Sequence, residues 1–110
     1  MKFYEIELNG KTVKFRLTTG DSMVIEKKVG KSILEFIGEL GSVTNITTLL
    51  MYMVRSSDPT FSEKKASELF DELIDNGYTI TSIVNDIILE ALQVSGFMTA
   101  EELKAMKDKK

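Results

Sequence analysis

Asn9 and Gly10 place the strongest constraint on how this chain begins to fold. They separate two runs, residues 3–8 and 11–17, in which polar and apolar side chains alternate. Alternation with a period of two is typical of β-strands that bury one face. An Asn-Gly pair suits the type I′ turn, whose two central residues both need positive φ. The first 18 residues therefore predict a β-hairpin with a two-residue loop.

The two-residue loop also determines which residues of the hairpin face one another. On the polar face Glu5 opposes Lys14, which predicts an ion pair, and Phe3 opposes Arg16, which predicts a cation–π contact. Because a lone hairpin is marginal in water, the apolar face must pack on helices. That face consists of Tyr4, Ile6, Leu8, Val13, Phe15 and Leu17.

After residue 18 the spacing of apolar residues changes from two to about 3.6, which predicts helices. Asp21 can cap the first of them. Capping boxes, in which a Ser or Thr precedes a Glu by three residues, open three others at Ser32, Thr60 and Thr99. The expected helices cover residues 21–29, 32–38, 42–55, 60–76, 80–96 and 99–103.

This order of elements predicts an α+β fold that is mostly α, with an N-terminal β-hairpin packed on a bundle of five or six helices. A chain of 110 residues is close to the commonest domain size. It also has no flexible linker long enough to divide domains. We therefore expect a single domain, 1–110, made of a hairpin (1–18) and a helical part (21–107), with residues 104–110 as a frayed basic tail.

The sequence contains no Cys and no His. Zinc sites built on thiolate or imidazole ligands are therefore excluded, as is Ser-His-Asp or Cys-His catalysis within one chain. No Gly-rich phosphate loop follows an expected strand. We expect a protein that is not an enzyme, with no catalytic residues, no metal site and no cofactor.

The charge balance disfavours nucleic acid as a partner. The 17 acidic and 14 basic residues give a net charge of −3, whereas nucleic-acid-binding domains usually carry a basic excess. Four carboxylates lie along one side of the expected helix 60–76, namely those of Glu68, Asp71, Glu72 and Asp75. We interpret them as a solvated face, with a partner-contact ridge and a metal or catalytic site as the alternatives.

Residues 49–54 are apolar around the whole helix, which indicates burial in a core or in an interface. Met51 and Tyr52 remain on the flank of the apolar stripe and are candidate partner-binding residues. The alternative is that they pack under the hairpin or the N-terminal helices, as part of the core. The stripe itself is complete with Val43, Ile46, Leu49, Leu50, Met53 and Val54.

The sequence shows neither a membrane-spanning nor a targeting pattern. Its longest apolar run, 49–54, is far shorter than the roughly 20 residues of a membrane helix. Residues 1–17 lack the continuous apolar region of a signal peptide. We expect a cytoplasmic protein with no membrane partner.

The order of several segments resembles the tail assembly chaperones of long-tailed phages and prophages of Gram-positive bacteria. The resemblance covers roughly residues 1–98 and consists of hydrophobicity and turn patterns. The segments are F-Y-E-I-E-L-N-G-K-T-V-K-F-R-L-T, G-D-S-M-V-I-E-K-K-V-G-K-S-I-L-E-F-I, the loop S-S-D-P-T-F-S-E, a helix that ends in N-G-Y, and a helix that ends in E-A-L-Q-V-S-G-F-M.

The resemblance implies a non-catalytic function. Such chaperones bind the tape-measure protein in the host cytoplasm, help to recruit tail-tube subunits and are not retained in the mature virion. Self-association is possible, and many exist in two forms, of which this chain resembles the shorter. The alternative is a small helical adaptor or regulatory protein that acts by protein–protein binding, with DNA binding less favoured because no expected helix is basic.

Overall fold

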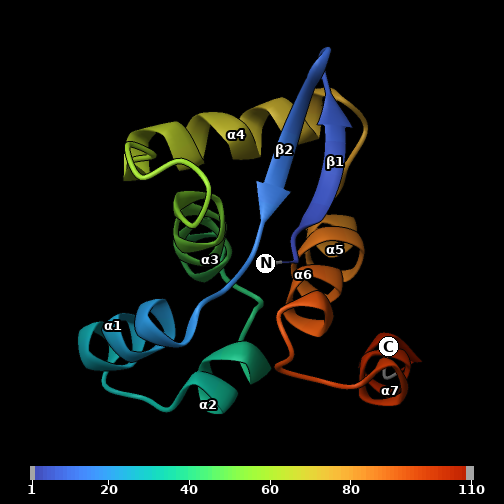
Figure 1. Cartoon of the computed structure of the whole chain (residues 1–110). Helices are drawn as coiled ribbons and strands as arrows, with labels where there is room; N and C mark the ends of the chain where they lie inside the picture. Colours follow the sequence, from blue (N-terminus) through green and yellow to red (C-terminus); the bar gives the residue numbers. More distant parts are fainter. Residues whose placement is uncertain (1, 109–110) are drawn as a thin grey trace.

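A two-stranded hairpin and six helices make up the computed structural model, which describes residues 2–108 (Figure 1). The helical segments α5, η1 and α6 follow one another without a break and form one helix. The predicted α+β fold, mostly α, is confirmed. The elements are β1 (Tyr4–Leu8), β2 (Lys11–Phe15), α1 (Thr19–Val29), α2 (Ile33–Gly38), α3 (Val43–Arg55), α4 (Glu63–Asp75), α5 (Ile80–Ile83), η1 (Val84–Ile88), α6 (Leu89–Val94) and α7 (Ala100–Asp108).

The hairpin has the predicted turn and the predicted register. Asn9 and Gly10 have φ of 52° and 79°, as a type I′ turn requires. Each residue of β1 lies opposite its expected partner in β2, from the Tyr4–Phe15 pair to the pair beside the turn. The apolar face packs on the helices, with Leu8, Phe15 and Leu17 buried and Tyr4, Ile6 and Val13 partly buried.

The polar face of the hairpin differs from the expectation in its contacts. No ion pair joins Glu5 to Lys14. Instead the Lys14 ammonium lies 5.7 Å from the centroid of the Phe3 ring, and Arg16 donates from Nη1 to the Lys2 carbonyl oxygen at 2.9 Å. Diagonal neighbours across two strands are within reach of a long side chain, and an exposed ion pair contributes little stability. The diagonal contact between Lys14 and Phe3 therefore takes the place of the expected Glu5–Lys14 ion pair.

Helix α3 is the centre of the fold. It contacts β2, α4 and η1 and lies between the hairpin, α4 and the N-terminal helices in Figure 1. Directly after β2, a backbone hydrogen bond from the Arg16 N–H to the Met53 carbonyl oxygen at 3.1 Å also joins the hairpin to α3. The next amide, that of Leu17, donates to the Ser95 hydroxyl at 3.0 Å. The exit of the hairpin thus links α3 to the end of α6.

Two helices begin at residues other than the predicted ones. Thr18 caps α1, because its hydroxyl accepts from the Asp21 amide at 3.1 Å; Asp21 lies in the first turn and is not the cap. Ser62 caps α4 in the same way. Thr60 was the predicted cap, but its hydroxyl donates to the Asp58 carboxylate at 2.7 Å. The turn that starts at Asp58 therefore captures Thr60 before the helix begins.

A π-helical segment interrupts the regular spacing expected for residues 80–96. The Leu89 amide donates to the Val84 carbonyl oxygen, five residues earlier. Such a turn takes up one extra residue and rotates the following residues by about 100° relative to a regular α-helix. In a regular helix Leu89 would lie away from the apolar stripe; with the π segment it is only 2% exposed.

The C-terminal segment is helical where a frayed tail was expected. Helix α7 extends to Asp108, with Leu103 buried and Lys107 paired with Glu90 of α6. The prediction of fraying over residues 104–110 is therefore wrong for 104–108. The contacts with α6 that hold this helix cannot be seen in its own sequence. Residues 109–110 lie outside the described part of the chain.

Replacement of Phe15 by Ala tests the packing of the hairpin. Because the ring is completely buried, we expect a loss of about 3 kcal/mol in the free energy of unfolding. Denaturant melts measure it. Val24→Ala, on the exposed side of α1, is the control and should change stability by less than about 0.5 kcal/mol. A similarly small change for Phe15→Ala would show that the face is not packed.

Candidate functional site

Met51 and Tyr52 belong to the hydrophobic core, with exposures of 6% and 9%. The expectation that they stand on an accessible flank of the helix is wrong. Neighbouring elements surround α3, so the turn around Met51 has no solvent face. The structure shows the alternative, in which both residues pack in the core. That they contact a partner stays a prediction, and their burial gives it no support.

The exposed apolar side chains lie on the peripheral parts of the helices instead. Leu34 of α2 is the most exposed of them within residues 2–108, at 71%. A leucine so accessible gains nothing from the core, because its apolar surface remains in water. The other large apolar side chains that are exposed are Met23, Val24, Val43, Ile74 and Ile80.

Leu34 borders a hollow of ≈ 310 Å³ between α2 and α7. Six of its eight lining residues have apolar side chains. The single charged one, Glu102, already accepts a hydrogen bond from the Thr99 amide at 2.9 Å. The hollow therefore suits apolar side chains of a partner better than a charged ligand. Its lining residues are Leu34, Ile37, Gly38, Phe97, Met98, Glu102, Ala105 and Met106.

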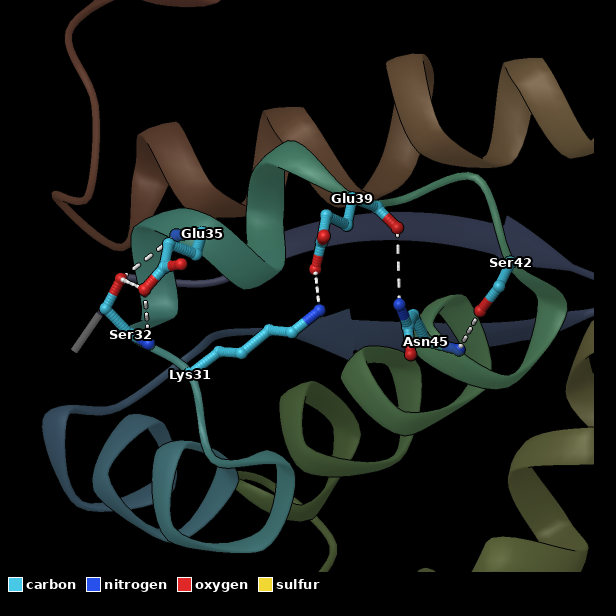
Figure 2. Close-up of polar contacts among 6 residues, drawn as sticks. All are labelled: Lys31, Ser32, Glu35, Glu39, Ser42 and Asn45. Carbon is cyan, nitrogen blue, oxygen red and sulfur yellow. Dashed lines mark hydrogen bonds and ion pairs between the residues drawn. The ribbon is translucent and has the colours of Figure 1, made fainter.

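Helix α2 is held at both ends, which sets the orientation of Leu34. At its start Ser32 and Glu35 form the predicted capping box, and at its end Lys31 pairs with Glu39 at 2.5 Å. Asn45 of α3 donates to the Glu39 carbonyl oxygen at 3.2 Å. Figure 2 shows these contacts along one side of the helix. A short helix with both ends bound presents its exposed residue in a defined direction.

Helix α7 forms the opposite wall and is joined to the body mainly through α6. The predicted capping box of Thr99 and Glu102 opens it. Leu103 is buried beneath it, and the ion pair between Lys107 and Glu90 connects its last turn to α6. Both ion-pair partners are partly exposed, so packing of Leu103 has a large share in holding this wall in place.

Tyr4 lies near the same ion pair, at the edge of the hairpin. Burial raises the pKa of the Tyr4 phenol, and the carboxylates of Glu90 and Asp86 raise it further, against a smaller lowering by Lys107. The neutral hydroxyl is thus the favoured form. The contact between β1 and α6 therefore has a structural role, because it joins the hairpin to the helices.

The carboxylates of α4 lie on its surface. Glu68, Asp71 and Asp75 are exposed, and Glu72 is partly buried. The side-chain amide of Asn9, at the tip of the hairpin, donates from Nδ2 to the Glu72 carboxylate at 2.5 Å. Within residues 2–108 no three acidic side chains gather closely enough to hold a metal ion. The described part of α4 thus presents a solvated face, with one residue that binds the hairpin.

A wider hollow of ≈ 760 Å³ lies where α1, α3 and α4 meet. Its α3 wall carries Thr44, Thr47 and Thr48, with Met51 beneath them. Thr47 and Thr48 already donate their hydroxyl protons to carbonyl oxygens of α3. Eight of its eleven lining residues have polar or charged side chains, so it is a weaker candidate for binding an apolar partner than the space beside Leu34.

Comparison of the chain with protein-family models, with curated proteins and with solved structures found no match. Among residues 2–108, no helix combines the length and the apolar character that a membrane crossing needs. The hollow between α2 and α7 is the binding surface that the geometry favours. Sequence reasoning missed it, although Leu34 and Ile37 were visible as apolar residues of a short helix.

A double variant, Met51→Ser with Tyr52→Asn, separates core from surface. Because both side chains are buried, each truncation should cost about 2 kcal/mol or more, and the domain should melt at a much lower denaturant concentration. Leu34→Ser, on the exposed face of α2, is the control and should melt almost as the wild type does. Unchanged melting of the double variant would place the two residues at the surface.

The protonation state of the Tyr4 phenol is measurable by titration of tyrosine absorbance. We expect Tyr4 to ionise above the usual value of about 10, and the Tyr4→Phe variant to lack this late component of the titration. Since the pKa is raised in the folded protein, the contribution to stability is complete below pH ~10 and decreases as the pH rises further. A late component that persists in Tyr4→Phe would contradict this assignment.

Proposed function

We propose that this protein is a tail assembly chaperone of a phage or prophage. It acts as a non-catalytic binding protein that covers apolar helices of the tape-measure protein and helps to recruit tail-tube subunits. The observation that carries the proposal is the apolar hollow between α2 and α7, with Leu34 exposed at its border. Apolar groups that remain open to water together are typical of partner-binding surfaces. The resemblance of residues 1–98 to these chaperones supplies the client.

The surface suits an amphipathic helix. Leu34 projects beside the hollow, so a client helix gains a protein side chain to pack against and a recess for its own. Helix-in-groove recognition uses apolar anchors spaced three or four residues apart. Methionines at two lining positions, Met98 and Met106, adapt to side chains of different shape. This would allow one surface to bind successive parts of a long client.

A limited apolar contact also supports temporary binding. Full burial of one leucine contributes only about 1.5–3 kcal/mol, so a few such contacts hold a client without fixing it permanently. A chaperone that works in the host cytoplasm and leaves before the virion is complete needs this reversibility. Neither a metal nor a cofactor has a part in the proposed mechanism.

Co-expression with the tape-measure protein encoded beside its gene tests the proposal. We expect the client to be soluble and to co-purify only in the presence of this protein. Leu34→Glu should weaken the complex tenfold or more, about 1.4 kcal/mol, with unchanged stability because Leu34 is already exposed. Val24→Glu, the same change from an apolar to an acidic side chain at an exposed residue of α1 outside the hollow, should leave binding intact.

Three results would contradict the proposal. The first is a gene neighbourhood without a tape-measure gene, and the second is a client that remains insoluble with the wild-type protein. The third is equal binding by the wild type and Leu34→Glu. Specific binding of a folded partner, with no effect on a tape-measure protein, would instead support the small helical adaptor.

A further inference from the structure

Helix α7 is fastened to the rest of the molecule at few points. Its main neighbour is α6, and towards α2 it leaves the hollow of ≈ 310 Å³. In Figure 1 it lies at the edge of the molecule, beyond the end of α6. Leu103 is its one buried side chain within the described residues, and Lys107 forms the ion pair with Glu90. An element with so few contacts can leave the body while the rest of the chain stays folded.

The boundary between the body and α7 is sharp. Ser95 belongs to the body, because its hydroxyl accepts from the Leu17 amide at 3.0 Å and donates to the Ala91 carbonyl oxygen at 2.6 Å. The next residue, Gly96, has a φ of 88°, a left-handed conformation that ends a helix and redirects the chain. Gly96 is therefore the hinge at which α7 can turn relative to α6.

The hydrogen bonds that close this turn are local. The Phe97 amide donates to the Leu92 carbonyl oxygen at 2.9 Å and the Gly96 amide to the Gln93 carbonyl oxygen at 3.1 Å, which is the pattern of a Schellman motif. In a continuous helix the same amides would donate to carbonyl groups four residues earlier. The one proline of the chain is Pro59, so none prevents α6 and α7 from joining. Straightening the hinge thus exchanges hydrogen bonds without losing them.

The part of α6 that α7 covers is the docking surface of this helix, and it fits α7 in particular. Leu103 is buried, and the partly buried Met106 and Lys107 follow three and four residues later, so the three share one side of α7. Lys107 meets Glu90 there. In a continuous helix α7 points away from its own docking surface. The same helix of a second copy offers every one of the contacts that are then left open.

We propose that two copies of this chain exchange α7, each placing it on α6 of the other. The hinge at Gly96 straightens, and the contacts of Leu103 and Lys107 form between copies instead of within one. Exchange of an identical element is a low-cost route to a dimer, because the contacts are those of the closed chain. Phe97 and Met98, both partly buried, lie in the straightened segments and supply apolar contacts where the two copies meet.

The exchange makes the candidate site a property of the pair. The hollow beside Leu34 has α2 as one wall and α7 as the other, so each hollow of the dimer is formed by residues of both copies. A client helix in either hollow then contacts both copies. This consequence rests on the proposed function, whereas the exchange itself does not.

Gly96→Ala tests the hinge. Alanine is strained at positive φ and favours a helix more than glycine does, so the closed turn becomes less stable and the straightened segment more stable. We expect the association constant of the dimer to rise about tenfold or more, measured by analytical ultracentrifugation.

Gly77→Ala is the matched control for the hinge. Gly77 ends α4 in the same motif, with a φ of 95° and the same two local hydrogen bonds. The helix that follows it, 80–94, is part of the core and cannot be exchanged without unfolding. We expect this variant to lose stability and to keep the association constant of the wild type.

Mixed dimers test the exchange without altering the hinge. In Glu90→Lys and in Lys107→Glu, charges of the same sign meet at the docking surface of each closed chain. Exchange between the two variants restores an opposite pair at both docking surfaces. We expect the mixed dimer to be about tenfold more abundant than either variant's own dimer, in native mass spectra with one variant isotope-labelled. Lys104→Glu in place of Lys107→Glu is the control of equal net charge, because Lys104 is exposed on α7, and should give no such preference.

A spin label shows directly on which copy α7 lies. The chain has no cysteine, so Lys104→Cys provides a single attachment point on α7. We mix this labelled protein with isotope-labelled wild type. In the dimer the label should broaden the amide signals of Leu34 and Glu90 in the isotope-labelled copy.

Three outcomes would overturn the proposal. They are equal association of Gly96→Ala and Gly77→Ala, mixed dimers no more abundant than in the Lys104 control, and no broadening in the isotope-labelled copy. If Gly96→Ala fails to fold, the charge variants and the spin label still decide, because they leave the hinge intact. Exchange without any binding of the tape-measure protein would contradict the proposed function alone.

Discussion

The second half of helix α3 has to be covered on every side, and most of the structure follows from that requirement. Its residues 49–54 have no charged side chain, and all six are buried. The elements β2, α4 and η1 each cover one side of it. The hairpin is stable because it has this helix to pack on, since a two-stranded sheet alone is marginal in water.

The burial of α3 also determines where binding is possible. Met51 and Tyr52 contribute to the core. A binding surface therefore has to be sought among the exposed residues of the other elements. Two peripheral surfaces remain, the apolar hollow beside Leu34 and the open edge of β2. They differ in chemistry, because the first is lined mostly by apolar side chains and the second combines a strand edge with three lysines and three carboxylates.

Local contacts explain which parts of the fold could be predicted. The turn at Asn9 and Gly10, the hairpin register and the capping boxes at Ser32 and Thr99 depend on residues close in sequence. The cap predicted at Thr60 shows the limit of such local reasoning. The Thr60 hydroxyl could bind either the Asp58 carboxylate or the first turn of the helix, and it binds Asp58. The candidate site was less predictable: Leu34 and Ile37 look alike in sequence, yet only one of them is exposed.

By itself the sequence determined the fold class, the hairpin and the exclusion of Cys- and His-based chemistry, because turn geometry, periodicity and residue type act over short distances. Only the tertiary structure decided that Met51 is buried, that a π turn rotates Leu89 into the core, and that α7 remains helical to Asp108. The physical reason is that burial and pairing are sums over segments far apart in the chain. The Lys107–Glu90 pair and the Asn9–Glu72 bond have no signal in either of the segments that they join.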